Sequence, residues 1–315
     1  MKEAIVLLNM GGPNNLNEVE VFLHNMFNDP YIIRTKSKLL RRFIAGIITL
    51  TRTEKSQDIY RKIGGKSPLV EHTHHLVQAL EKTIGTDVVV DFVMRYTPPM
   101  AQEVCMRLKG QGIEKVYLIP LYPQYSTTTT QSSLDDFEMV AHLIGWDVIT
   151  VEIKHFFMHR GYNACLIERI KESLRDDDAQ NFDIIFSAHG LPQKIVNQGD
   201  PYQRHVIAHV GLMKSLMIEQ GIRFNRVHLA YQSKVGPMKW LEPDLATTLH
   251  ELENKRVIIV PIAFTIDNSE TDFELSIEYA EVAHELKFEE YRVCRCPNDH
   301  PLFVQTLKEL YEKMR

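Results

Sequence analysis

The sequence contains no long apolar run, no low-complexity segment and no surplus of positive charge. Because a membrane-spanning helix needs about 20 consecutive apolar residues, none is expected here. The first residues, MKEAIVLLNMGG, lack the apolar length and cleavage signal of a secretory peptide. The formal net charge of -5 argues against a nucleic-acid-binding surface, which usually needs a basic excess. The sequence therefore indicates a cytoplasmic, globular protein with no nucleic-acid partner.

Cysteine is also scarce. The four cysteines, Cys105, Cys165, Cys294 and Cys296, include no CxxC pair and no closely spaced framework. Such a pattern is typical of reduced thiols rather than of disulfides. A metal site at Cys294 and Cys296 is the alternative, but two alternating residues of a strand point to opposite faces. We therefore interpret all four as structural thiols.

Short apolar runs separated by helical patterns recur along the chain, four in each half. Alternating strands and helices predict parallel sheets built by right-handed crossovers. The predicted fold class is α/β: two Rossmann-like domains, each a four-stranded parallel sheet flanked by helices, with a cleft between them. The expected strands are Ala4–Leu8, Val88–Val93, Val116–Leu121, Val148–Val151, Ile184–Phe186, Val227–Ala230, Val257–Phe264 and Tyr291–Cys294.

A chain of 315 residues exceeds one ordinary hydrophobic core, so two domains are expected. The boundary between them is predicted near residues 146–154. This gives an N-terminal domain of residues 1–150 and a C-terminal domain of residues 151–315. No Gly/Ser-rich linker occurs there, so the junction is expected to be packed. A single large domain is the competing interpretation.

The segment DIIFSAHGLPQKIVNQGDPY, residues 183–202, places a histidine at the end of a predicted strand. In an open α/β sheet, ligands bind at the carboxyl ends of the strands. His189 could there bind a metal or transfer a proton near neutral pH, and a loop histidine bonded only to backbone is the alternative. The loop after His189 contains several residues that restrict backbone conformation: Gly190, Pro192 and a second turn at 199–202. A simple connection would not require so many.

Glu270, Glu274 and Glu278 recur every four residues after the predicted strand Val257–Phe264. On a helix they share one face, where like charges lower stability. A solvated acidic face is one explanation, and a carboxylate row that attracts a divalent cation or relays protons is the other. We expect His189 and Glu270 to face each other, because both follow strands of one domain. One imidazole and one carboxylate suit a metal in transit, such as Fe(II), better than a closed structural site.

The strand ends of the first half carry different residues. A Gly-Gly pair follows the first strand and would let backbone approach a ligand, although the dinucleotide and phosphate-loop spacings are absent. Met10 beside it is either a core residue or a soft contact for a flat apolar partner. Arg95 and Tyr96 end the second strand, and Tyr125 follows the third. These residue types suit a large, flat ligand that carries carboxylates.

Residues 34–53 combine basic side chains with the apolar run FIAGIITL. The segment is too short to cross a membrane but has the composition of an interfacial anchor, with cations for anionic lipids and apolar side chains for the acyl boundary. An ordinary helix packed on its own domain is the alternative, because the apolar residues are not confined to one stripe. Peripheral membrane contact is therefore one of two hypotheses for this segment.

Several segments resemble those of the ferrochelatases. FSAHGLP with the downstream GDPY is similar to the family's signature. Other similar segments, in the family's order, are LNMGGP, YRKIGGKSP, MRY, YPQYS, QSKVGPMKWLEP and VPIAFTIDNSET, and the similarity runs from about Ile5 to Pro301. The resemblance implies insertion of Fe(II) into protoporphyrin IX to give protohaem, the terminal step of haem synthesis, on two Rossmann-like domains.

The resemblance also implies roles for individual residues. His189 and Glu270 match the family's two facing active-site residues, which are expected to be catalytic and to bind the metal. Asp267 matches an acidic neighbour, and Glu274 with Glu278 matches an acidic row leading from the pocket. The positions that match residues contacting or framing the porphyrin are Met10, Arg52, Tyr60, Ser67, Arg95, Tyr96, Tyr125, Trp240 and Phe264, of which Tyr60 and Ser67 belong to a lip.

Metal insertion expels two pyrrole protons, so the site needs a base, a metal route and walls that grip the ring. His189 would accept or relay protons, Glu270 would bind iron or carry protons, and Trp240 with Met10 would hold the macrocycle. Asn268 is a departure, because many members of the family have a second histidine there. No cysteine follows Cys296, so the iron-sulfur cluster of many members is not expected, and Fe(II) is a substrate rather than a cofactor.

Two other functions remain open. A chelatase for coproporphyrin or sirohydrochlorin would keep the chemistry and change the pocket. Relatives of the coproporphyrin type tend to carry tyrosine at the position of Met10, which favours protoporphyrin IX. A non-catalytic tetrapyrrole carrier would not need both His189 and Glu270, so their joint presence argues against it.

Overall fold

The computed structural model of the protein describes residues 1–234, 236 and 238–315. Val235 and Pro237, within the QSKVGPMKWLEP segment, lie outside the described residues. The chain forms two compact units. Unit 1 comprises Met1–His155 with Val304–Arg315, and unit 2 comprises Phe156–Phe303.

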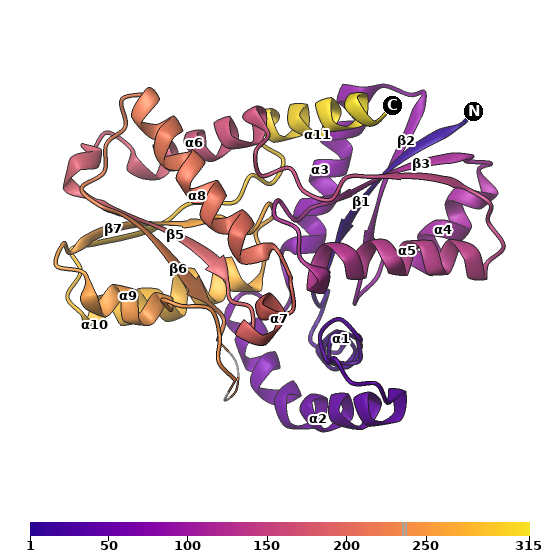
Figure 1. The fold of residues 1–315 in the computed structure, drawn as a ribbon, viewed down its shortest axis with the longest axis horizontal. Helices are drawn as coiled ribbons and strands as arrows, with labels where there is room; N and C mark the ends of the chain where they lie inside the picture. The colour runs from indigo at the N-terminus through magenta and orange to yellow at the C-terminus, as the bar shows by residue number, and fades with distance from the viewer. Residues whose placement is uncertain (235, 237) are drawn as a thin grey trace. The chain divides into compact units, whose positions relative to one another are not determined.

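Each unit is built on a parallel sheet, and within the described residues each sheet has four strands (Figure 1). The order in unit 1 is β2-β1-β3-β4, and the order in unit 2 is β6-β5-β7-β8. The strands are β1 (Glu3–Asn9), β2 (Val88–Met94), β3 (Lys115–Pro120), β4 (Ile149–Glu152), β5 (Asp183–His189), β6 (Val227–Gln232), β7 (Arg256–Pro261) and β8 (Glu290–Val293). The predicted fold class is confirmed, with small shifts at the strand ends: β5 continues to His189 and β7 ends at Pro261.

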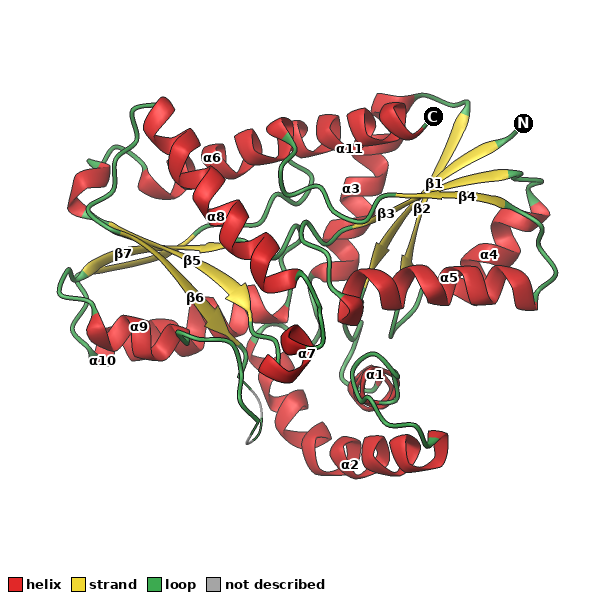
Figure 2. Ribbon diagram, in the orientation of Figure 1, coloured by secondary structure: helices red, strands yellow, loops and turns green. Residues whose placement is uncertain are grey.

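Helices cover both faces of each sheet (Figure 2). In unit 1, α3 (Leu69–Ile84) lies on one face and α4 (Ala101–Gly110) with α5 (Ser132–Leu143) on the other. In unit 2, one face is covered by α6 (Arg160–Leu174) and α8 (Tyr202–Glu219). The opposite face is covered by α9 (Leu245–Glu251) and α10 (Tyr279–Glu285). The shorter elements are the π-helices η1 (Thr127–Gln131) and η3 (Glu270–Glu278), the 3-10 helix η2 (Ala179–Asn181) and α7 (Gln193–Asn197).

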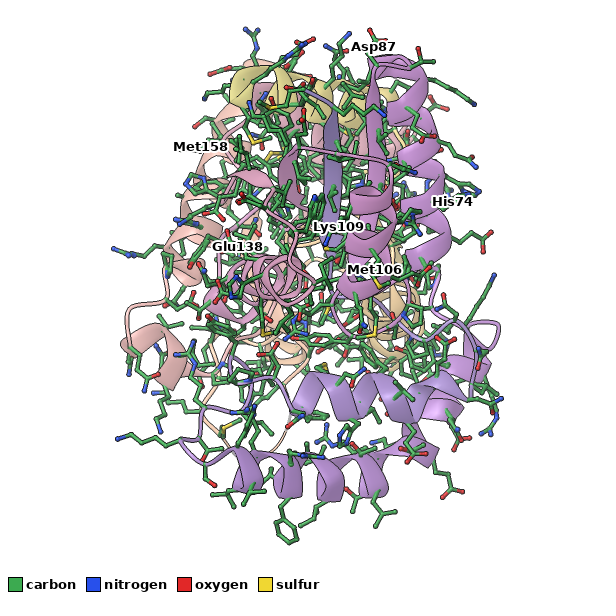
Figure 3. The ribbon with its side chains drawn as sticks, turned by 90° about the vertical axis from the view of Figure 1, so that its right-hand side faces the viewer. His74, Asp87, Met106, Lys109, Glu138 and Met158 are labelled. Carbon is green, nitrogen blue, oxygen red and sulfur yellow. The ribbon has the colours of Figure 1, made fainter. Side chains whose placement is uncertain are left out.

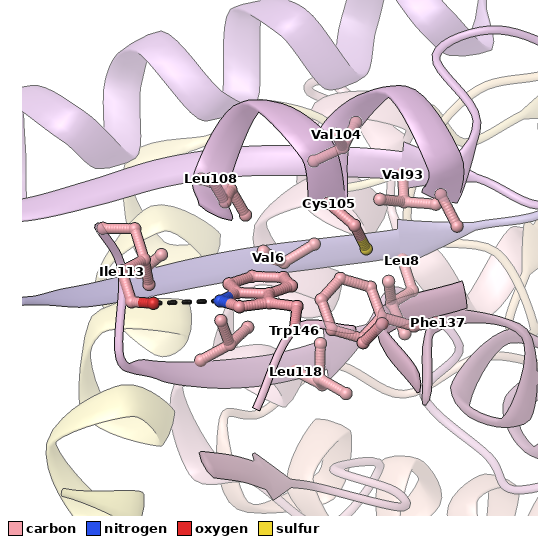
Figure 4. Close-up of a cluster of buried hydrophobic side chains, with 14 of the residues drawn as sticks. Val6, Leu8, Val93, Val104, Cys105, Leu108, Ile113, Leu118, Phe137 and Trp146 are labelled. Carbon is pink, nitrogen blue, oxygen red and sulfur yellow. Dashed lines mark hydrogen bonds between the residues drawn. The ribbon is translucent and has the colours of Figure 1, made fainter. Parts of the chain in front are cut away.

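β1 is a continuous apolar run because the core of unit 1 buries both of its faces. Val6 and Leu8 point toward α4 and α5, and Ile5 and Leu7 alternate with them toward the opposite face, where they are equally buried. Trp146 closes the first of these layers beside Phe137 (Figure 4). Its indole N–H donates to the carbonyl of Ile113 at 3.1 Å, which satisfies the single polar atom of a buried ring.

The last helix, α11 (Pro301–Met314), begins in unit 2 and ends in unit 1. The ring of Tyr311 packs edge-on against Tyr117 at 4.9 Å between centroids, and its hydroxyl donates to the carboxylate of Glu3. The sequence-based domain of residues 151–315 differs from the structure at this helix. Tyr311 and Tyr117 are more than 190 residues apart in the sequence. The periodicity of strands and helices does not predict a contact over such a separation.

Two helices of unit 1 lie outside the sheet layers: α1 (Glu18–Phe27) and α2 (Lys38–Lys62). Ser37 caps α2 by accepting a hydrogen bond from the amide of Leu40. The inward side of α2 carries Ala45 and Thr49, which are buried. Its outward side is an apolar stripe that remains exposed: Leu39 (79%), Phe43 (66%), Ile47 (48%) and Leu50 (85%).

These exposed residues recur at spacings of three and four, so they form a single helical stripe. Figure 3 shows apolar side chains on α2, at the bottom of the view, that point away from the sheet. The apolar residues of this segment are therefore divided between two faces, and the larger ones are on the outside. Among the helices of the described residues, none combines the length and apolar character needed to cross a bilayer.

Candidate functional site

The candidate site of unit 2 lies at the carboxyl ends of its strands. β5 ends at His189, which pairs in register with Gln232, the last residue of β6. The ring of Phe264, three residues beyond the end of β7, meets the imidazole edge-on at 6.2 Å between centroids. Side chains at the ends of β5 and β6, and one from the loop after β7, therefore lie at the same edge of the sheet, as the parallel topology requires.

The imidazole of His189 lies close to the carboxylate of Glu270. Burial lowers the pKa of His189 below its ordinary value, and the negative charge of Glu270 acts in the opposite direction with a smaller effect. The burial effect prevails, so the ring is neutral at physiological pH. A neutral imidazole beside a carboxylate can accept a proton or bind a divalent metal.

The backbone around His189 is held tightly. The carbonyl of His189 accepts a hydrogen bond from the hydroxyl of Tyr202 at 2.9 Å. The amide of Gly190 donates to the carbonyl of Gln232 at 2.8 Å, and a Cβ at Gly190 would lie 2.8 Å from that oxygen. The same Cβ would lie 3.2 Å from the ring of Trp240. Glycine is therefore required for the close packing of Trp240 against position 190. The hydrogen bond from Tyr202 to His189 shows that the GDPY segment holds the backbone of this loop.

The acidic row lies on a π-helix, η3, rather than on a regular α-helix. The exposed fraction rises along it, because Glu270 and Glu274 are partly buried and Glu278 is exposed. Burial, followed by the charges of Glu270 and Glu278, raises the pKa of Glu274 to about 7. The three carboxylates are thus close enough to influence one another. A π-helix is rare and frequently marks a functional site.

Two residues that the sequence-based reasoning missed hold Glu274. The hydroxyl of Ser233 and the side-chain amide of Gln232 both donate to the same carboxylate oxygen of Glu274. The amide oxygen of Gln232 in turn accepts from the buried hydroxyl of Ser187 at 2.7 Å. Ser233 has a φ of 65°, an uncommon conformation for a residue with a side chain. The sequence feature that could have indicated these two residues is the polar pair Gln232–Ser233 at the carboxyl end of a predicted strand.

Asp267 has a different position from the row. Its carboxylate accepts hydrogen bonds from the amide of Cys296 at 3.0 Å and from the side chain of Asn298 at 2.6 Å. Asp267 therefore fastens the loop after β8 to the loop after β7. Cys294 and Cys296 follow β8 and are buried, and all four cysteines of the chain are free thiols.

In unit 1, Met10 follows β1 and is partly buried. The Gly-Gly pair beside it packs against the protein's own chain. Gly11 has a φ of 85°, and a Cβ there would lie 2.3 Å from the hydroxyl of Thr97. A Cβ at Gly12 would lie 2.6 Å from Ser67. The close approach predicted for these glycines therefore has an internal explanation, which is the packing of Thr97 and Ser67.

Arg95 is engaged by the protein itself. Its guanidinium contacts the carboxylates of Asp29 at 3.1 Å and Asp136 at 3.2 Å, and it donates to the hydroxyl of Ser132. Asp29 is fully buried and also accepts from the hydroxyl of Tyr96. Because two carboxylates neutralise one guanidinium, the structure places Arg95 and Tyr96 in a supporting network under the strand ends.

The remaining residues expected at a porphyrin lie in three places in unit 1. The hydroxyl of Tyr125 donates to Gln131, at the end of η1. Tyr60 is buried against Val19 and Leu23 of α1, and Arg52 lies over the ring of Phe27 at 6.0 Å. Arg52 and Tyr60 thus belong to the packing of α2 on α1, whereas Met10 precedes the Gly-Gly pair in the chain and Ser67 packs against Gly12.

Comparisons with known proteins identify the family of the chain. The family model described as Ferrochelatase matches residues 2–315. The chain belongs to the ferrochelatase family. It is 61% identical over 314 residues to the ferrochelatase of Sulfurimonas denitrificans, which covers 100% of this chain and 99% of that protein. It is 49% identical over 312 residues to the ferrochelatase of Nitratiruptor sp., covering 99% of this chain and 100% of that protein.

The fold itself is shared more widely than the ferrochelatase family. SirB from Bacillus subtilis, solved with Fe3+, superimposes with a TM-score of 0.59 at 14% identity and covers 100% of this chain and 96% of that one. At this identity the likeness concerns the fold alone. In the part of the chain that the structure describes, no group of three or more His, Cys, Asp or Glu side chains is arranged to hold a metal ion. His189 and Glu270 are a pair, which leaves coordination positions open.

Proposed function

We propose that this chain is a ferrochelatase that inserts Fe(II) into protoporphyrin IX to give protohaem, the last step of haem synthesis. The observation that carries the proposal is the neutral His189 beside Glu270 at the carboxyl edge of the unit 2 sheet. The apolar rings of Phe264 and Trp240 next to His189 support a flat aromatic substrate. Family membership over the whole chain supports the reaction class.

The reaction exchanges one Fe(II) ion for two pyrrole protons. His189 accepts a proton because its imidazole is neutral, and Glu270 binds the incoming iron or carries a proton. Glu274 and Glu278 continue from Glu270 toward the surface as a relay. With its pKa raised to about 7, Glu274 can take up and release protons at neutral pH. Asp267 serves the relay by holding its loop.

For unit 2, Trp240 and Phe264 are proposed to contact the macrocycle. For unit 1, Met10 and Tyr125 are proposed as contacts, and Arg95 and Tyr96 as the frame beneath them. Arg52, partly exposed on α2, is proposed as a cation for a propionate, and Tyr60 and Ser67 as parts of the lip. The internal ion pairs of Arg95 support this division of roles.

No resident cofactor is proposed, because Fe(II) is the substrate. Burial raises the pKa of the Cys294 thiol to about 12 and that of Cys296 well above its ordinary value. We propose that the chain works without an iron-sulfur cluster, because its four cysteines form no closely spaced set of cluster ligands.

Residues 34–53 are proposed to make peripheral contact with a membrane from the cytoplasmic side. The exposed stripe of α2 would enter the acyl boundary, and the neighbouring cations would contact anionic headgroups. Sedimentation with phosphatidylglycerol vesicles, compared with phosphatidylcholine vesicles, measures this contact. Phe43→Glu should reduce binding, whereas Leu143→Glu, at an equally exposed position on α5, should not. Equal binding of both variants would contradict the proposal.

The function is tested by anaerobic incubation of the purified chain with Fe(II) and either protoporphyrin IX or coproporphyrin III, followed by porphyrin absorbance. Haem formation from protoporphyrin IX is the expected result. Preferential metalation of coproporphyrin III would reassign the substrate. Binding of either porphyrin without metalation would replace the enzyme by a tetrapyrrole carrier.

A further inference from the structure

Asn268 lies buried two residues before η3, with 5% of its surface exposed. Its side-chain oxygen accepts hydrogen bonds from the amides of Glu270 at 2.9 Å and Thr271 at 3.2 Å. Its side-chain nitrogen donates to the carbonyl of Ile266 at 3.2 Å. A carbonyl oxygen has two lone pairs, and both are used here. Asn268 therefore caps the helical segment that begins at Ser269 and continues as η3, and it has no lone pair left for a metal.

The cap is reciprocal. The backbone amide of Asn268 donates to the hydroxyl of Thr271 at 2.9 Å, so each residue satisfies the other's backbone. This is the arrangement of a capping box, with asparagine and threonine in the two positions. Two consecutive amides of η3, those of Glu270 and Thr271, are thereby tied to one side chain. The backbone from which the Glu270 carboxylate projects is fixed directly by Asn268.

The cap is itself anchored to another loop of unit 2. The preceding residue, Asp267, donates its amide to the side-chain oxygen of Asn298 and accepts from the side-chain nitrogen of the same residue. The backbone of Asn298 has a φ of 50°, a conformation that asparagine tolerates better than most residues. Hydrogen bonds thus run without interruption from the loop after β8 to the first residue of the acidic row.

We propose that Asn268 is a positioning residue for metal insertion, which fixes the Glu270 carboxylate relative to His189 through the cap of η3. The proposal rests on the proposed chelatase function. It assigns Asn268 neither proton transfer nor metal binding, because its polar atoms are occupied. A displacement of about 1 Å in a catalytic group can lower a rate by up to about 100-fold. Loss of the cap next to Glu270 is therefore expected to lower kcat.

The test compares Asn268→Ala, Asn268→Ser and Asn254→Ala in the full chain. Serine keeps an oxygen that can cap the helix, whereas alanine does not. Asn254 is the matched control, because its side chain also holds a backbone amide, that of Arg256, but at the opposite end of β7. For each variant, kcat and the KM for protoporphyrin IX are measured with Fe(II). Amide exchange in the 268–278 segment is followed by mass spectrometry.

Asn268→Ala is expected to accelerate exchange in this segment and to lower kcat about tenfold, with KM changed less than twofold. Asn268→Ser should recover most of kcat, and Asn254→Ala should leave kcat within twofold. Retention of kcat in Asn268→Ala despite faster exchange would overturn the inference, as would an equal loss in Asn254→Ala. If the unsubstituted chain itself formed no haem, the proposed function would fall, a result distinct from any difference between variants.

Discussion

The two units have the same sheet topology and different chemistry at their strand ends. β3 and β7 are both six residues long and end at Pro120 and Pro261, and a π-helix follows each of them. At the next strand over, Asn9 pairs in register with Met94 in unit 1, whereas His189 pairs with Gln232 in unit 2. The last register pair therefore presents an amide and a thioether in unit 1 and an imidazole and an amide in unit 2.

The carboxylates near the carboxyl edges of the two sheets also differ in their ion pairing. In unit 1, Arg95 forms ion pairs with both Asp29 and Asp136, so these acidic groups serve packing. In unit 2, no cation among the described residues forms an ion pair with Glu270, Glu274 or Glu278. A paired carboxylate stabilises a fold, and unpaired, partly buried carboxylates remain available to an incoming cation. We therefore propose that the reactive chemistry belongs to unit 2.

Replacing His189 breaks this comparison most strongly. His189→Ala should lower the rate of haem formation roughly 1000-fold or more, because the site loses its neutral base. Porphyrin binding, measured by quenching of protein fluorescence, should remain. Asn9→Ala, in the last register pair of β1 with β2 in unit 1, should keep turnover within about fivefold. Near-normal turnover in His189→Ala would remove the histidine from the mechanism.

Glu270→Gln tests the carboxylate that faces His189. The substitution keeps the size of the side chain and removes its charge, so turnover should fall about 100-fold. The opposing charge of Glu270 raises the pKa of His189, so the pKa of the imidazole should fall further in this variant. Single-turnover absorbance and NMR titration of the histidines measure the two effects. A higher pKa for His189 would contradict the proposed proximity.

Arg95→Ala tests the supporting network of unit 1. Removing one partner leaves the buried Asp29 unpaired, so the free energy of unfolding should fall by about 3 kcal/mol. Urea unfolding measures this change, and the KM for porphyrin is measured on the folded fraction. Unchanged stability together with a large rise in KM would instead make Arg95 a ligand for porphyrin carboxylates.

Glu274→Gln should give a smaller effect that depends on pH. The folded-state pKa of Glu274, about 7, lies above the unfolded value of 4.5, so the folded state binds the proton more tightly. Stability from this group is therefore present below about pH 4.5 and is lost as pH rises to about 7. The glutamine variant avoids this loss and should be about 2 kcal/mol more stable than the unsubstituted chain at pH 8.

Urea unfolding at pH 4.5 and pH 8 checks this expectation, and the two proteins should differ little at the lower pH. Ser233→Ala offers a comparison, because it removes a hydrogen bond to Glu274 and keeps the carboxyl group. A stability difference independent of pH would show that Glu274 does not titrate in this range.

Much of unit 2 could be predicted from local pattern. Apolar runs bounded by turn residues gave all eight strands to within a few residues, and the chain order of strands and helices gave the parallel topology. His189 and Glu270 could be placed together because parallel strands end at one edge of a sheet. The resemblance to ferrochelatases added the reaction and the family, which the comparisons confirm.

Other features required the packed structure. The sequence showed Arg95 at a strand end, but only the structure shows that Asp29 and Asp136 occupy its guanidinium. The glycines at positions 11 and 12 indicated a close approach, but not that Thr97 and Ser67 make it. The stripe on α2 could not be assigned to an outer face until α1 was seen to cover the other.

The sequence by itself determined which segments form strands, in which order they follow, and which chemically active side chains lie at strand ends. These features depend on periodicity and on turn-forming residues, and both involve residues that are close together in the sequence. The tertiary structure decided which of those side chains are paired, buried or left open. Ser233 and Gln232 reach Glu274, and Asn298 reaches Asp267, across 31 to 42 residues. Such contacts exist only after the sheets and their loops have packed, because hydrogen bonds depend on distance in space and not on separation along the chain.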